Sequence, residues 1–196
     1  RNAAASRTRA YRVEEKFDKN RLKAFIDKLL IHRIKVYRDG ADAIMIPTSQ
    51  PQFRMVQTFF ETYQRYRDSV FYDASAWSVA NFYHMKYRPV RSAAGNEEIT
   101  STEGLYPVAP VEFSNYAYII DWNDYNAPAL LRQLQSSGLV LSSAFKPFTT
   151  QVGELSQSFS YGALVLPVSL QKKTPQEVHE LLLEAQKKWQ VPAYAV

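Results

Sequence analysis

The chain has 196 residues, of which 46% are hydrophobic and 22% charged, an ordinary composition for a soluble globular protein. Cysteine is absent, which excludes disulfides, thiolate metal sites and cysteine nucleophiles. Residues 1–38 carry 12 Lys and Arg against 4 Asp and Glu, so the net charge of +5 belongs to the first segment. Binding of nucleic acid would depend on that basic segment. The simpler interpretation is that its charges form a solvated face or a surface that contacts another domain.

The chain begins with an Ala-, Ser- and Arg-rich arm at 1–13, followed by a helix predicted over 18–32 with Asp18 as its cap. One face of this helix is apolar: Leu22, Phe25, Ile26, Leu29 and Leu30. The later elements are predicted in this order: strands at 34–37 and 43–46, a helix from Pro51, an apolar run at 70–73, a helix at about 74–83, a polar loop at 91–104, a strand at 116–121, a helix at 127–137, strands at 140–145 and 163–166, a helix at 175–189 and a strand at 191–196.

One pattern occurs twice. Residues 43–49 read Ala-Ile-Met-Ile-Pro-Thr-Ser and residues 163–169 read Ala-Leu-Val-Leu-Pro-Val-Ser, and a Pro-Gln pair follows each copy. An unbroken aliphatic run closed by Pro is typical of a strand that is buried on both faces, as in parallel sheets. Strands alternate with helices from residue 116 onward, so we predict a layered α/β fold: a mostly parallel, flavodoxin-like sheet with helices on both faces, plus the first helix.

We predict a single α/β domain over 14–196 behind the flexible arm, with the helix at 18–32 free to contact a neighbouring domain. No apolar run reaches the ~18 residues of a membrane helix. The first residues lack an initiator Met, and the last six form a strand-like run. We therefore expect the chain to be a piece of a longer protein.

Catalytic motifs are not visible in the sequence. His32, His84 and His179 are far apart and in no zinc-binding frame, and the six glycines form no phosphate-binding loop or nucleophile elbow. An enzyme in its own right would depend on carboxylate pairs such as Asp121 and Asp124.

Two stretches combine polar and aromatic residues at predicted strand ends, where α/β sheets bind ligands. The first is Asp121, Trp122, Asn123 and Asp124, whose oxygens also suit Ca²⁺. Capping of the next helix by Asp124 or Asn126 is the simpler explanation.

The second stretch contains Asp73, Ser75 and Trp77. Here a helix cap at Asp73 or Ser75, with Trp77 in the core, is again the simpler explanation.

Several strings resemble a region of large zinc carboxypeptidase-like proteins, C-terminal to the peptidase domain, whose α/β domains are similar to class I glutamine amidotransferases. The strings cover about residues 40–196: 46–52 (Ile-Pro-Thr-Ser-Gln-Pro-Gln), 71–77 (Phe-Tyr-Asp-Ala-Ser-Ala-Trp), 116–124, 146–148 (Lys-Pro-Phe) and 161–168 (Tyr-Gly-Ala-Leu-Val-Leu-Pro-Val). The family's zinc-binding and catalytic residues would lie upstream, so no catalytic residue, metal site or cofactor is expected in this chain. The amidotransferase likeness concerns the fold alone, since that chemistry requires a cysteine.

The resemblance implies a non-catalytic accessory domain of a periplasmic or extracellular metallocarboxypeptidase-like protein. Such a domain would contact other domains of the same polypeptide and shape access of a peptide or peptidoglycan substrate to the peptidase. The alternative is a non-catalytic module for glycan or peptidoglycan fragments, with its site at the two polar and aromatic stretches. Neither hypothesis involves nucleic acid or a membrane span.

Overall fold

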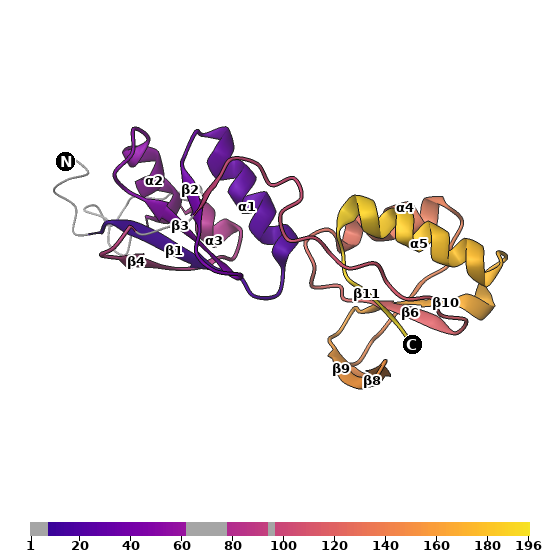
Figure 1. Cartoon of the computed structure of the whole chain (residues 1–196). Helices are drawn as coiled ribbons and strands as arrows, with labels where there is room; N and C mark the ends of the chain where they lie inside the picture. Colours follow the sequence, from indigo (N-terminus) through magenta and orange to yellow (C-terminus); the bar gives the residue numbers. More distant parts are fainter. Residues whose placement is uncertain (1–7, 62–77, 94–96) are drawn as a thin grey trace, which may run out of the picture. The chain divides into compact units, whose positions relative to one another are not determined.

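The computed structural model describes residues 8–61, 78–93 and 97–196. The chain divides into two compact units, Arg1–Leu105 and Tyr106–Val196 (Figure 1). The stretch 14–196, which we predicted as one domain, is therefore described as unit 1 and unit 2, each by itself. None of the helices in the described ranges is long and apolar enough to cross a membrane.

Unit 1 is built on a five-stranded antiparallel sheet with the strand order β4-β1-β3-β2-β5. Its elements are β1 (Ala10–Glu14), α1 (Lys19–Ile31), β2 (Val36–Arg38), β3 (Ala43–Pro47), α2 (Phe53–Phe60), α3 (Val79–Phe82), β4 (Lys86–Val90) and β5 (Glu97–Ile99). Tyr11 of β1 stacks on Phe60 of α2 with ring centroids 4.3 Å apart, and Tyr87 of β4 meets the same ring edge-on at 5.1 Å. These tyrosines therefore lie on the face of the sheet that α2 covers.

Helix α1 confirms the sequence prediction for this segment. The Asp18 side chain accepts a hydrogen bond from the backbone amide of Arg21 at 2.8 Å, as a helix cap does. Four of the five predicted apolar residues are buried: Leu22, Phe25, Ile26 and Leu29.

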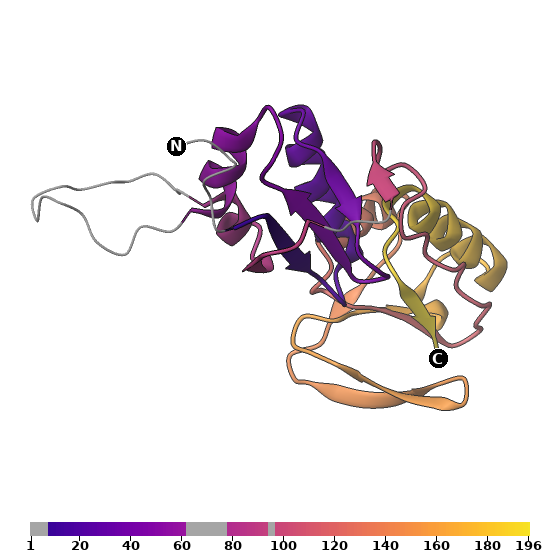
Figure 2. The ribbon, with the colours of Figure 1, turned by 60° about the vertical axis from the view of Figure 1, so that its left-hand side comes forward.

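Unit 2 has a four-stranded antiparallel sheet with the order β11-β6-β10-β7, and a separate hairpin, β8-β9. Its elements are β6 (Ala117–Ile120), α4 (Ala127–Ser136), β7 (Ser142–Ser143), β8 (Phe148–Val152), β9 (Leu155–Phe159), β10 (Leu164–Pro167), a 3-10 turn η2 (Val168–Leu170), α5 (Pro175–Trp189) and β11 (Ala193–Ala195). Both helices lie on one side of the sheet, and Figure 2 shows the hairpin as a long pair of strands on the other.

The predicted fold class is wrong, because the sheets are antiparallel throughout the described part of the chain. They are neither flavodoxin-like nor glutamine amidotransferase-like. The physical reason is visible in β6, all four of whose residues are buried. Tyr118 and Ile120 pack into the core with α4 and α5, whereas Ile119 packs with Phe159 of the hairpin on the opposite face. A strand between two covered faces has an unbroken apolar sequence whichever direction its neighbours run.

The repeated sequence pattern occupies the same place in both units. Each unit has the order strand-helix-strand-strand-helix-strand and pairs its strands fourth-first-third-second, which is the ferredoxin-like topology. In unit 1, α2 and α3 together take the place of the second helix, and β5 is added beyond the second strand. The two copies of the pattern form β3 and β10, the third strand of each unit. The hairpin β8-β9 is an insertion in unit 2 between its second and third strands.

Candidate functional site

A groove of about 530 Å³ runs beside β11 in unit 2, and we call it the β11 groove. Its volume falls in the range of sites that hold small ligands. Its walls come from three segments: residues 107–112, the turn of the hairpin at Val152 and Gly153, and the last strand with the proline before it. The lining residues are Pro107, Val108, Ala109, Pro110, Val111, Glu112, Val152, Gly153, Pro192, Ala193, Tyr194 and Ala195.

Strand β11 presents main-chain groups to this groove. It is an outer strand of the sheet and pairs with β6 on one side. Val196 and Ala117 exchange two backbone hydrogen bonds, at 3.1 and 3.4 Å. Because bonded and non-bonded pairs alternate in an antiparallel ladder, the N–H and C=O groups of Ala193 and Ala195 point away from β6. Within the described residues those groups make no other hydrogen bond.

The segment 107–112 forms the opposite wall and is held by two glutamines at the end of α5. The amide of Val108 donates to Oε1 of Gln190 at 3.0 Å, and the amide of Val111 donates to Oε1 of Gln186 at 2.9 Å. Gln186 is 3% exposed, and its Nε2 also donates to the carbonyl of Val191 at 3.3 Å. These bonds tie two of the segment's amides to the end of α5 and do not pair them with β11.

The hairpin supports β11 from the side of the sheet that lacks helices. Tyr194 meets Phe159 edge-on with ring centroids 5.3 Å apart, and Phe159 stacks on Phe148 at the same separation. Burial raises the pKa of the Tyr194 phenol, and the nearby carboxylates Asp121 and Asp124 raise it further. The phenol therefore stays protonated at neutral pH and remains a hydrogen-bond donor.

The predicted ligand residues at 121–124 lie directly after β6, as expected from the sequence. Their polar atoms are used locally: Oδ1 of Asp121 accepts from the amide of Asn123 at 3.0 Å and from its Nδ2 at 2.9 Å. Oδ1 of Asp124 accepts from the amide of Asn126 at 2.8 Å. Asn126 is at the cap position of α4, but its side chain donates to the carbonyl of Trp189 instead of capping the helix.

Trp122 is 37% exposed and lies against Gly162, where an added Cβ would come within 3.0 Å of the indole Cδ1. The close approach explains why this position, with a φ of +83°, is glycine. One part of the ring packs on backbone and the remainder faces solvent. Binding of a ligand at Trp122 or its neighbours remains a prediction.

Asp73, Ser75 and Trp77, the second predicted stretch, lie outside the described residues. No three His, Cys, Asp or Glu side chains come close enough to hold a metal ion within 8–61, 78–93 and 97–196. Sequence reasoning missed Ala193 and Ala195, which act through main-chain groups. It also missed Gln186 of α5 and Gln190 directly after it, which act through side-chain amides. The one sequence feature that could have pointed to this site is the absence of charged residues from the predicted strand at 191–196.

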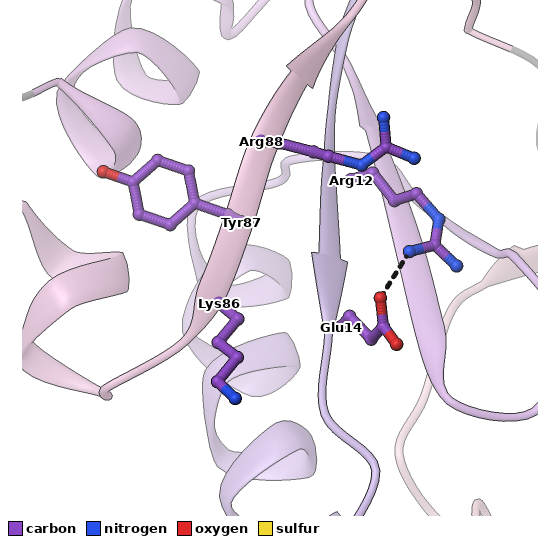
Figure 3. A pocket seen from close by; sticks show the side chains of 5 residues that line it. All are labelled: Arg12, Glu14, Lys86, Tyr87 and Arg88. Atoms are coloured by element: carbon purple, nitrogen blue, oxygen red, sulfur yellow. Dashed lines mark hydrogen bonds and ion pairs between the residues drawn. The ribbon is translucent and has the colours of Figure 1, made fainter.

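A smaller hollow of about 110 Å³ lies on the sheet of unit 1 (Figure 3). Arg12 and Glu14 of β1 and Lys86 and Arg88 of β4 line it, while Tyr87 points to the other face of the strand. Arg12 donates to Glu14 at 2.8 Å and to Asp39 at 2.6 Å, and these hydrogen bonds raise its pKa. The guanidinium is thus already occupied by two carboxylates, and the hollow is small, so the β11 groove is the better candidate site.

No family model, curated protein or solved structure matches this chain. The resemblance to zinc carboxypeptidase-like proteins therefore stays a prediction.

Proposed function

We propose that this chain is a non-catalytic accessory region of a secreted or periplasmic zinc carboxypeptidase-like protein, and that unit 2 holds extended polypeptide in the β11 groove. The observation that carries the peptide-binding part of this proposal is the groove itself: it is mostly apolar and runs along a strand with outward main-chain donors and acceptors. The link to zinc carboxypeptidase-like proteins rests on the sequence strings alone. Apolar walls with a few convergent polar groups are the usual composition of a ligand site.

The groove favours a peptide over a sugar. Among its lining residues Glu112 is the one with a charged side chain, and Tyr194 is the one aromatic. Sugar sites depend on side-chain hydrogen bonds and broad aromatic surfaces, whereas peptide recognition along a strand depends on backbone groups. An accessory region that holds a peptide would keep a substrate near an upstream peptidase domain.

The test is selection of peptides on the chain from a phage-displayed library of random dodecapeptides. Ala109 is an exposed residue that lines the groove, so Ala109→Trp should fill the groove without disturbing the core. The matched control is Ala41→Trp, at an exposed position of unit 1.

We expect peptides to be enriched on the native chain and on Ala41→Trp, and to bind Ala109→Trp at least tenfold more weakly. The absence of enrichment on the native chain, or equal binding to all three proteins, would refute the proposal.

The second candidate function is binding of glycan or peptidoglycan fragments, favoured by the partly exposed rings of Trp122 and Tyr125 beside Asp121 and Asn123. Titration with muropeptides, followed by tryptophan fluorescence, tests it. A spectrum unchanged at saturating concentration, or one that changes equally in Trp122→Ala, would remove this candidate.

A further inference from the structure

We propose that the β11 groove takes its peptide as an added β-strand, hydrogen-bonded to the outer edge of β11, and prefers peptides with a basic residue near Glu112. The inference rests on the proposed peptide-binding function and specifies how that peptide is recognised. The shape of the groove does not determine whether a bound peptide pairs with β11; the direction of the main-chain groups of β11 does.

The outer strands of the two main sheets differ in whether their sequence discourages pairing with a further strand. Proteins usually protect such strands with charges, proline or short length. Strand β4 carries Lys86, Arg88 and Pro89, β5 carries Glu97 and Glu98, and β7 is two serines long. Strand β11 is Ala-Tyr-Ala, with no charge and no proline inside it. Of these four strands it is the one whose edge is chemically ready to accept another strand.

The outward groups of β11 have the spacing that strand addition requires. Ala193 and Ala195 are two residues apart, about 7 Å along a strand, and each offers one N–H and one C=O. Four main-chain hydrogen bonds are therefore available to an extended segment of three or four residues. The side chains of Ala193 and Ala195 pack into the core with α4 and α5 and do not obstruct the outer edge of β11.

The opposite wall limits the occupant to a single strand. Residues 107–112 line the groove together with β11, and their amides at Val108 and Val111 are bonded to Gln190 and Gln186. A second copy of this chain would have to bring a whole sheet edge into a slot bordered by this segment and by the hairpin turn. One extended peptide meets no such obstruction.

Glu112 gives the groove a charge preference. It is exposed, and it is the charged residue among those that line the groove. A Lys or Arg on the peptide can place its apolar stem along Val111 and its charge against this carboxylate. Side chains of an added strand alternate between its two faces. A single basic residue, at a position on the face toward Glu112, can therefore make this contact.

The experiment uses the library-selected peptides, synthesised with a single N-methyl group at each position in turn, and measures their affinity for the whole chain. Strand addition predicts an alternation of period two: methylation of amides that face β11 weakens binding at least tenfold, and methylation of the amides between them changes it less than about twofold. The selected peptides should also be enriched in Lys and Arg, and Glu112→Gln should weaken their binding threefold or more.

The possible outcomes separate the two proposals. Peptides that bind the native chain in preference to Ala109→Trp but show no alternation would overturn strand addition and leave peptide binding in place. Selection that yields no peptide at all would overturn both. Peptides without basic residues, whose affinity is equal for Glu112→Gln, would overturn the charge preference.

Discussion

Gln186 should contribute more to the stability of unit 2 than any surface glutamine of the same helix. Its side chain is 3% exposed, and it accepts from the amide of Val111 and donates to the carbonyl of Val191. In Gln186→Leu both backbone groups lose their partner, and the residues that carry them are 7% and 0% exposed. A buried polar group left unpaired costs about 1–3 kcal/mol, so we expect the two groups together to cost about 2–6 kcal/mol.

The matched control is Gln176→Leu, also on α5, where the side chain is exposed and bonds to Glu180 at 2.9 Å. Such an exposed pair contributes less than about 0.5 kcal/mol. Urea unfolding followed by tryptophan fluorescence, to which Trp122 and Trp189 of unit 2 contribute, compares the two variants with the native chain. Equal stability of the two variants would show that Gln186 does not support the wall of the groove.

Three further changes test other parts of the structure. Tyr118→Phe removes a fully buried hydroxyl that lies 3.0 Å from Nδ1 of His179, and should cost about 1–2 kcal/mol in urea unfolding; an unchanged midpoint would contradict this. Gly162→Ala places a Cβ 3.0 Å from the indole of Trp122 at a φ of +83°, so it should destabilise unit 2 and shift the tryptophan emission; native stability and emission would refute the packing. Burial opposes ionisation of Glu15, but hydrogen bonds from the backbone and from an arginine outweigh it, so its pKa lies below the ordinary 4.5. The stabilisation that ionised Glu15 gives the folded state should be complete above about pH 4.5 and lost as the pH falls through the lowered pKa. Glu15→Gln should therefore make stability depend less on pH in this acid range. An identical dependence of stability on pH in the variant and the native chain would contradict a contribution from Glu15.

Local elements were predictable from the sequence because capping and apolar spacing act over a few residues. Asp18 and the apolar face of α1 are examples, and the two repeated strings do form strands. Strand direction was not predictable, because the sequence of β6 reports burial on two faces and does not report which neighbours cover them. The cover on one face is the β8-β9 hairpin, from residues 148–159, where no element was predicted from the sequence.

The candidate site was less predictable than the fold. Asp121 was correctly placed after a buried strand, but the polar atoms of that stretch bond to one another. The β11 groove depends on the backbone of Ala193 and Ala195, and a main-chain donor has no signature in the residue type. It becomes visible once the pairing of β11 with β6 fixes which groups face outward.

The most direct test of an open β11 edge is amide hydrogen exchange, measured residue by residue by NMR on the chain without added peptide. The amides of Tyr194 and Val196 face β6, and that of Val196 donates to Ala117 at 3.1 Å. We predict that these two are protected and that Ala193 and Ala195 exchange at least tenfold faster. Equal protection along 193–196 would mean that the outer edge is already covered, and it would contradict both the groove and the strand addition proposed for it.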